Sequence, residues 1–133
     1  MASIHDSLLT GYTVDGHGRT MIFHTEQHAG GGEQFIDVRF RGVVAYHFEG
    51  DCLHNIVGEF YEVLPEQIVG DGLAFAERNS LYGWPVGWDR REETASDFLR
   101  RIGARVFELE TSYGMWGWVA AESIEYIVVE PPA

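Results

Sequence analysis

Apolar and polar residues alternate along residues 34–49, and this alternation is the clearest structural signal in the chain. One parity carries six apolar side chains, those of Ile36, Val38, Phe40, Val44, Tyr46 and Phe48. The other parity carries polar side chains, those of Asp37, Arg39, Arg41, His47 and Glu49. A period of two predicts one long β-strand with a buried face and a wetter face. Gly42 is expected at a bend or bulge within this strand.

Shorter patterns on either side predict the remaining elements. Strands are expected at residues 8–14, 19–27 and 52–64, and a hairpin within 104–130 closes the chain. Two short helices are expected before that hairpin. The first lies within 65–83, with Asp71 as N-cap and Gly83 near its end. The second spans 94–103, because Thr94 can cap it and Gly103 can end it.

This order of elements predicts an α+β fold in a single domain, residues 1–133. Short connections favour antiparallel pairing, so we expect a curved antiparallel sheet of about six to seven strands. The two helices are expected to cover one face of the sheet. The alternative is a mostly-β barrel with peripheral helices.

Composition narrows the classes of partner. The formal net charge is −12, all nine basic residues are arginine, and lysine is absent. A surface this acidic repels phosphate, which disfavours nucleic acids and anionic membranes. It would speed encounter with a basic protein, but the favoured interpretation is that the charge keeps the protein soluble. A single cysteine and the lack of a signal-peptide pattern predict a cytoplasmic protein. The absence of lysine suggests codon bias in a GC-rich, bacterial genome.

The stretch "AYHFEGDCLHN" (45–55) gives the sharpest chemical hypothesis. Gly50 and Asp51 are typical of a tight hairpin turn. That turn would place His47 opposite His54 and would put Glu49 and Cys52 on the same face. Two imidazoles, a thiolate and a carboxylate can bind zinc, although their spacing matches no established zinc signature. An ordinary hairpin tip without metal is the favoured interpretation, and a nucleophilic role for Cys52 is weaker still.

Three further patterns each admit a structural and a functional interpretation. His24, Glu26 and His28 alternate along one strand, as metal ligands can, but exposed strand faces look the same. The carboxylates of "EFYEVLPE" (59–66) and "FELE" (107–110) fit a solvated face. All four tryptophans lie near glycines and could bind a ligand or a partner, or could fill the core. They are Trp84, Trp88, Trp116 and Trp118.

Three functions are compatible with these observations. The leading hypothesis is a small acidic binding domain without catalytic activity that engages a protein partner; its composition resembles that of toxin-neutralising immunity proteins. The second is a metal-binding or metal-dependent domain that uses His47, Cys52 and His54, with zinc as the metal. The third is a small-molecule binding protein with a tryptophan-lined pocket. No cofactor other than zinc is expected.

Overall fold

A computed structural model describes residues 4–28, 32–69 and 87–131 of the chain. Eight strands form one antiparallel sheet in the order β4-β7-β6-β5-β1-β2-β3-β8. The strands are β1 (Ser7–Asp15), β2 (Thr20–Gln27), β3 (Gln34–Arg41), β4 (Ala45–Glu49), β5 (Asn55–Val63), β6 (Arg105–Tyr113), β7 (Trp116–Ala121) and β8 (Ser123–Val129). The helices in the described residues are α1 (Pro65–Ile68) and α3 (Ala95–Arg101).

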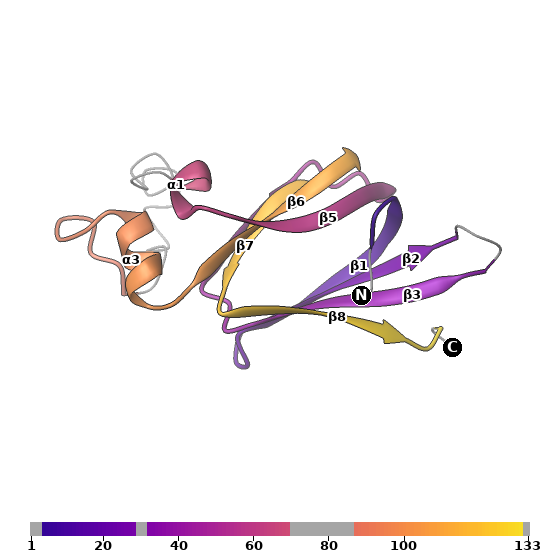
Figure 1. Ribbon diagram of the computed structural model, residues 1–133, viewed down its shortest axis with the longest axis horizontal. Helices are drawn as coiled ribbons and strands as arrows, with labels where there is room; N and C mark the ends of the chain where they lie inside the picture. Colours follow the sequence, from indigo (N-terminus) through magenta and orange to yellow (C-terminus); the bar gives the residue numbers. More distant parts are fainter. Residues whose placement is uncertain (1–3, 29–31, 70–86, 132–133) are drawn as a thin grey trace.

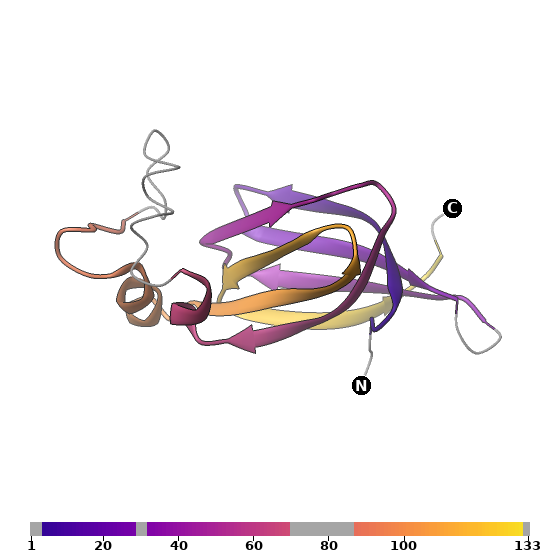
Figure 2. The same cartoon turned by 90° about the horizontal axis from the view of Figure 1, so that it is seen from above.

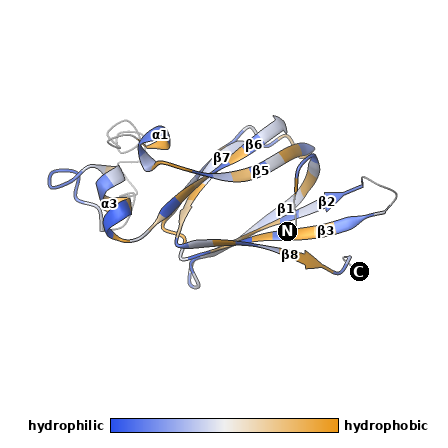
Figure 3. Ribbon diagram, viewed as in Figure 1, coloured by the Kyte–Doolittle hydropathy of each residue, from blue (hydrophilic) through white to orange (hydrophobic). Residues whose placement is uncertain are grey.

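The sheet curves strongly, so that its two halves face each other (Figures 1 and 2). Along β2, buried and partly buried residues alternate as the period of two requires. Figure 3 shows the corresponding alternation of hydrophobic and hydrophilic residues along the strands. The inner faces enclose one apolar cluster, to which Phe23, Phe40, Phe60 and Phe107 contribute from four different strands. Adjacent rings lie 4.9–5.8 Å apart between centroids, which is ordinary aromatic packing distance.

The two helices pack at one end of the sheet, against the outer face of β6 and β7 (Figure 1). Phe98 and Leu99 of α3 form a second apolar cluster there with Val106 and Trp118. As predicted, the Oγ1 atom of Thr94 accepts a hydrogen bond from the Asp97 amide at 3.1 Å, and Gly103 follows the helix with a φ of +77°. Neither helix has the length and apolar character needed to cross a membrane. The expected N-cap Asp71 and the expected helix end at Gly83 lie outside the described residues.

The α+β class is supported, but the sheet has eight strands instead of six or seven. It is also not closed into a barrel, because β4 and β8 each pair with a single neighbour within the described chain. The single strand predicted for residues 34–49 is two strands. Gly42, with a φ of +66°, separates them, and β3 pairs with β2 and β8 while β4 pairs with β7. The predicted closing hairpin is likewise three strands, because β8 follows β7 and joins β3.

The predicted burial holds for β3 and only in part for β4. Ile36, Val38 and Phe40 are at most 1% exposed. Tyr46 of β4 is 43% exposed instead, whereas Phe48, on the same parity, packs against the inner cluster. Ala45, on the opposite parity, is buried in the cluster beneath the helices.

The predicted hairpin at Gly50 and Asp51 does not form. β4 pairs with β7, so that His47 lies opposite Trp118, whereas β5 pairs with β1 and β6. Residues 50–54 therefore connect two strands that are separated in the sheet by β7 and β6. The prediction failed because a Gly-Asp pair signals a change of direction but does not specify the strand that follows as a partner.

Candidate functional site

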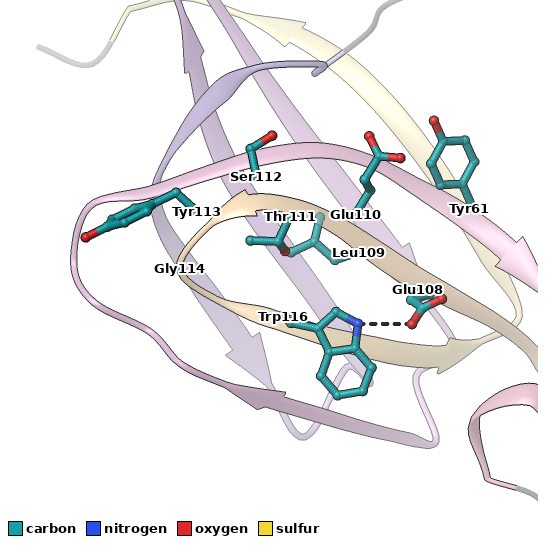
Figure 4. Close-up of a pocket in the computed structure, with 9 residues that line it drawn as sticks. All are labelled: Tyr61, Glu108, Leu109, Glu110, Thr111, Ser112, Tyr113, Gly114 and Trp116. Carbon is teal, nitrogen blue, oxygen red and sulfur yellow. Dashed lines mark hydrogen bonds between the residues drawn. The ribbon is translucent and has the colours of Figure 1, made fainter.

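An open hollow of about 470 Å³ lies on the outer face of β5, β6 and β7, at the end where β6 turns into β7 (Figure 4). Its principal side chains come from three neighbouring strands: Tyr61 from β5, Glu108 and Glu110 from β6, and Trp116 from β7. Tyr113, at the end of β6, adds a third aromatic ring. The hollow combines carboxylates with exposed aromatic surface, which is the chemistry of a binding site for cations.

The alternation of β6 determines which side chains reach this face. Leu109 is 1% exposed and belongs to the inner core, so its neighbours Glu108 and Glu110 point outward. Strand pairing then places Glu108 between Tyr61 on one side and Trp118 on the other. Trp116, two residues before Trp118, shares the outward parity of β7.

One carboxylate of the hollow is held by a hydrogen bond, and the other lies over a glycine of β5. The indole Nε1–H of Trp116 donates a hydrogen bond to Oε2 of Glu108 at 3.0 Å (Figure 4). Glu110 lies over Gly58 of β5, where a Cβ atom would collide with its carboxylate. The imidazole Nδ1 of His5 approaches Oε1 of Glu110 at 3.9 Å, and both side chains are about half exposed.

The charge of the hollow is not balanced by arginine. None of the residues that line it is an arginine. Six arginines form ion pairs at other places in the described chain, for example Arg105 with Glu62 on β5, where the guanidinium lowers the pKa of the carboxyl group. These six are Arg39, Arg41, Arg91, Arg100, Arg101 and Arg105. These six arginines therefore neutralise acidic groups elsewhere in the described chain, and no arginine lines the hollow to offset its carboxylates.

The buried amide of Asn55 joins the 50–54 connection to the β6–β7 turn beside the hollow. Its Oδ1 atom accepts hydrogen bonds from the backbone N–H groups of Met115 at 2.9 Å and Cys52 at 3.2 Å. Its Nδ2 group donates to Oδ1 of Asp51 at 2.9 Å, and the same oxygen accepts from the Leu53 amide at 3.0 Å. Asn55 is 3% exposed, so these contacts replace water around a buried polar group.

This connection presents Leu53 to solvent. Leu53 is 91% exposed, and its φ of +71° lies in the left-handed region that disfavours branched side chains. Strained residues of this kind concentrate at functional sites, because elsewhere nothing offsets their cost. Leu53 is therefore an exposed apolar group held beside the acidic hollow.

The proposed zinc ligands do not share the hairpin geometry on which they were predicted. Nε2 of His47 lies 3.2 Å from Oε2 of Glu49. The Cys52 thiol donates to the backbone oxygen of His54 at 3.4 Å and lies 3.6 Å from Oδ1 of Asn55. The side chain of His54 is exposed at the end of the connection. Zinc binding by these four residues stays a prediction, which metal analysis of protein purified without a histidine tag would test.

The described tryptophans lie at separate places. Trp116 lines the hollow, and Trp118 is 3% exposed in the cluster beneath the helices. Trp88 packs against that same cluster and donates its indole N–H to the Glu93 carbonyl at 2.9 Å. Trp84 lies outside the described residues. Of the described three, only Trp116 contributes to the hollow.

The alternating His24, Glu26 and His28 are divided between two sets of contacts. Nδ1 of His24 lies 2.8 Å from the Asp37 carboxylate on β3. His28 contacts Glu26 through Nε2 at 2.5 Å and Glu33 through Nδ1 at 3.6 Å. Glu26, His28 and Glu33 are the one set of three that brings possible metal-binding atoms together in the described part of the chain. The carboxylates contact different ring nitrogens, so one of them would have to move before both could share a metal ion with the same nitrogen.

Comparison with protein-family models, curated proteins and solved structures finds no match to the chain. The case for function therefore rests on its own residues. Glu108 and Glu110 belong to the "FELE" stretch, which the sequence indicated only as a solvated face. Tyr61 and Asn55 were not singled out. The role of Tyr61 follows from the pairing of β5 with β6, and that of Asn55 from the contact of the 50–54 connection with the β6–β7 turn. No local sequence pattern predicts either contact.

Proposed function

We propose that the chain is a binding domain without catalytic activity, which engages a positively charged segment of a partner protein. The binding face is the hollow on β5, β6 and β7, with Glu108 and Glu110 as the charged groups and Tyr61, Tyr113 and Trp116 as the aromatic groups. The observation that carries the proposal is the combination of two carboxylates, exposed rings and no arginine in the lining of one hollow.

Charge and exposed surface support this function independently. With a net charge of −12, the whole molecule attracts a basic partner at long range and accelerates encounter. At short range, Tyr61, Tyr113 and Trp116 are 51%, 60% and 36% exposed, so their rings can be covered on binding. Large aromatic side chains are the residues that most often dominate the energy of protein interfaces.

Leu53 extends the same face with an apolar anchor. Its connection is fixed to the β6–β7 turn through Asn55, so Leu53 does not have to be ordered when the partner binds. A group that is already held in place loses less entropy on binding than a mobile one. The left-handed backbone of Leu53 costs folding free energy, and a contact between Leu53 and the partner would offset that cost.

The test is binding of a fluorescein-labelled nonapeptide in which lysine and arginine alternate with glycine, measured by fluorescence polarisation. Affinity should fall by about tenfold or more between about 0.05 and 0.5 M salt, because added ions screen the attraction. The double variant Glu108→Gln/Glu110→Gln should bind at least about fivefold more weakly, because two charged contacts are lost.

The matched control is Glu92→Gln/Glu130→Gln, which changes the net charge equally at two exposed positions outside the hollow. It should bind the peptide within about twofold of the unaltered chain, since distant exposed charges are screened. Equal losses in both double variants, or binding that does not depend on salt, would contradict the proposed face. Capture from cell extract at low and high salt would then identify the natural partner.

A further inference from the structure

The two carboxylates of the hollow lie on the same face of one strand. Glu108 and Glu110 are two residues apart, which separates their Cα atoms by about 6.6–6.8 Å. A lysine ammonium is a compact point charge without a planar face. A guanidinium spreads five N–H donors over a planar group and can donate from different edges to two acceptors.

The aromatic ring beside Glu108 is held in a fixed orientation. Because the Trp116 indole N–H donates to Glu108 at 3.0 Å, the ring is tied to the carboxylate that a cation would contact. The bond occupies Oε2 and leaves Oε1 of Glu108 for another donor. A planar guanidinium can donate to this carboxylate while it stacks face to face on an aromatic ring, whereas an ammonium has no planar face to stack.

Gly58 gives the second carboxylate its position. The side chain of Glu110 lies across the space above Gly58, and any larger residue there would displace it. Glu110 is thereby held over β5, the strand that also carries Tyr61. Among the described residues, Nδ1 of His5 approaches Oε1 of Glu110 at 3.9 Å, which is longer than a hydrogen bond.

From this geometry we infer that the hollow is a receptor for one arginine side chain of the partner, stacked on Trp116 and bound by Glu108, with Glu110 adding negative charge on the β5 side. This inference rests on the proposed function, because it names the group of the basic partner that the same face selects. Arginine is preferred to lysine for its planar shape and the directions of its donors, since both residues carry the same charge.

Three labelled nonapeptides test the inference, identical except at the central residue of a glycine–serine sequence with two flanking lysines. That residue is arginine, lysine or citrulline, the last being neutral and nearly the same shape as arginine. The arginine peptide should bind at least about fivefold more tightly than the lysine peptide, because a guanidinium can stack on Trp116 while it donates to Glu108 and an ammonium cannot stack. The citrulline peptide should bind more weakly than either charged peptide.

Two variants test which residues cause the preference for arginine over lysine. Trp116→Leu should reduce the ratio of arginine to lysine affinity to about one while leaving salt-dependent binding of both peptides, because the stacking surface is lost and the carboxylates remain. Glu108→Gln keeps an oxygen that can accept from the Trp116 indole, so it tests the charge if the tryptophan variant fails to fold. It should also lower the ratio, whereas Glu92→Gln, outside the hollow, should leave the ratio unchanged.

The possible outcomes distinguish failure of the arginine-receptor inference from failure of the proposed function. Equal, salt-sensitive binding of the arginine and lysine peptides would overturn the arginine receptor and leave the acidic binding face intact. Failure of both peptides to bind would overturn both. A preference for arginine that survives Trp116→Leu and Glu108→Gln would also overturn the inference, because the selecting groups would lie elsewhere.

Discussion

Replacing Asn55 with alanine should destabilise the fold more than any single change at an exposed position near the binding face. The amide of Asn55 is buried, and it bonds to the side chain of Asp51 and to the backbone N–H groups of Cys52 and Met115. Asn55→Ala leaves the buried N–H group of Met115 without its acceptor, which costs about 1–3 kcal/mol. Loss of the bond to Asp51 adds about 0.5–1.5 kcal/mol. We expect the free energy of unfolding to fall by about 3 kcal/mol in total.

Urea denaturation followed by tryptophan fluorescence measures this loss. With a urea dependence of about 2 kcal/mol per molar, the midpoint should fall by about 1.5 M. His54→Ala is the control, because His54 is exposed and lies next to Asn55; it should change the free energy by less than about 0.5 kcal/mol. The reasoning would be refuted by a loss below about 1 kcal/mol in Asn55→Ala, or by equal losses in the two variants.

The same variant should alter the titration of Asp51. Hydrogen bonds from the Asn55 side chain, and secondarily from the Leu53 amide, lower the pKa of this carboxyl group. A lowered pKa in the folded state stabilises the fold above the unfolded pKa of about 3.9, and this stabilisation is lost as the pH falls through the folded value. In Asn55→Ala the largest cause is removed, so the pKa of Asp51 should rise toward its ordinary value. Carbon-13 NMR titration of the carboxyl group measures the shift.

Three further changes test other parts of the structure. Gly117→Ala should cost about 2 kcal/mol or more in urea denaturation, because its Cβ would collide with the backbone of β4 at His47, whereas Gly11→Ala meets open space and should be nearly neutral. Leu53→Gly should stabilise the fold by up to about 1 kcal/mol, since glycine accepts a positive φ, and should weaken peptide binding in the polarisation assay. Burial and the nearby carboxylate of Glu59 raise the pKa of Tyr126 to about 12, so its phenol should ionise last in an absorbance titration, and Tyr126→Phe should remove that step.

Local sequence patterns were sufficient for the elements whose signals are local. The turn between β1 and β2 and the alternation of β3 were predictable, because glycine-rich turns and a period of two act over a few residues. The helix α3 was predictable for the same reason, from a threonine cap and a terminal glycine. In each case the residues that determine the structure are close together in the sequence.

The break after β3 shows where local patterns fail. The alternation weakens after Gly42, where Val43 and Ala45 put apolar side chains on the otherwise polar parity, but this does not specify which strands pair with each half. What separates β3 from β4 is the left-handed backbone at Gly42 and the position of Glu122, whose side chain occupies the space where a Cβ of residue 42 would lie. Glu122 is 80 positions away in the sequence, and a contact of that range is fixed by the fold as a whole.

The signal that predicts the true partner of residues 45–49 lies outside the stretch 45–55, in another strand. Gly117 stands between two tryptophans in a strand pattern, and glycine in such a place often marks a close approach of another backbone. The approaching backbone is that of β4, so the residue that specifies the partner of β4 is in β7. Once β4 is drawn to β7, the Gly50–Asp51 pair cannot return the chain alongside β4. It instead leads to the β6–β7 turn, where Asn55 fixes the connection and Leu53 is exposed to solvent. The acidic face that we propose to be the binding site is assembled by the neighbouring pairings of β5 with β6 and of β6 with β7, which no short stretch of the sequence specifies.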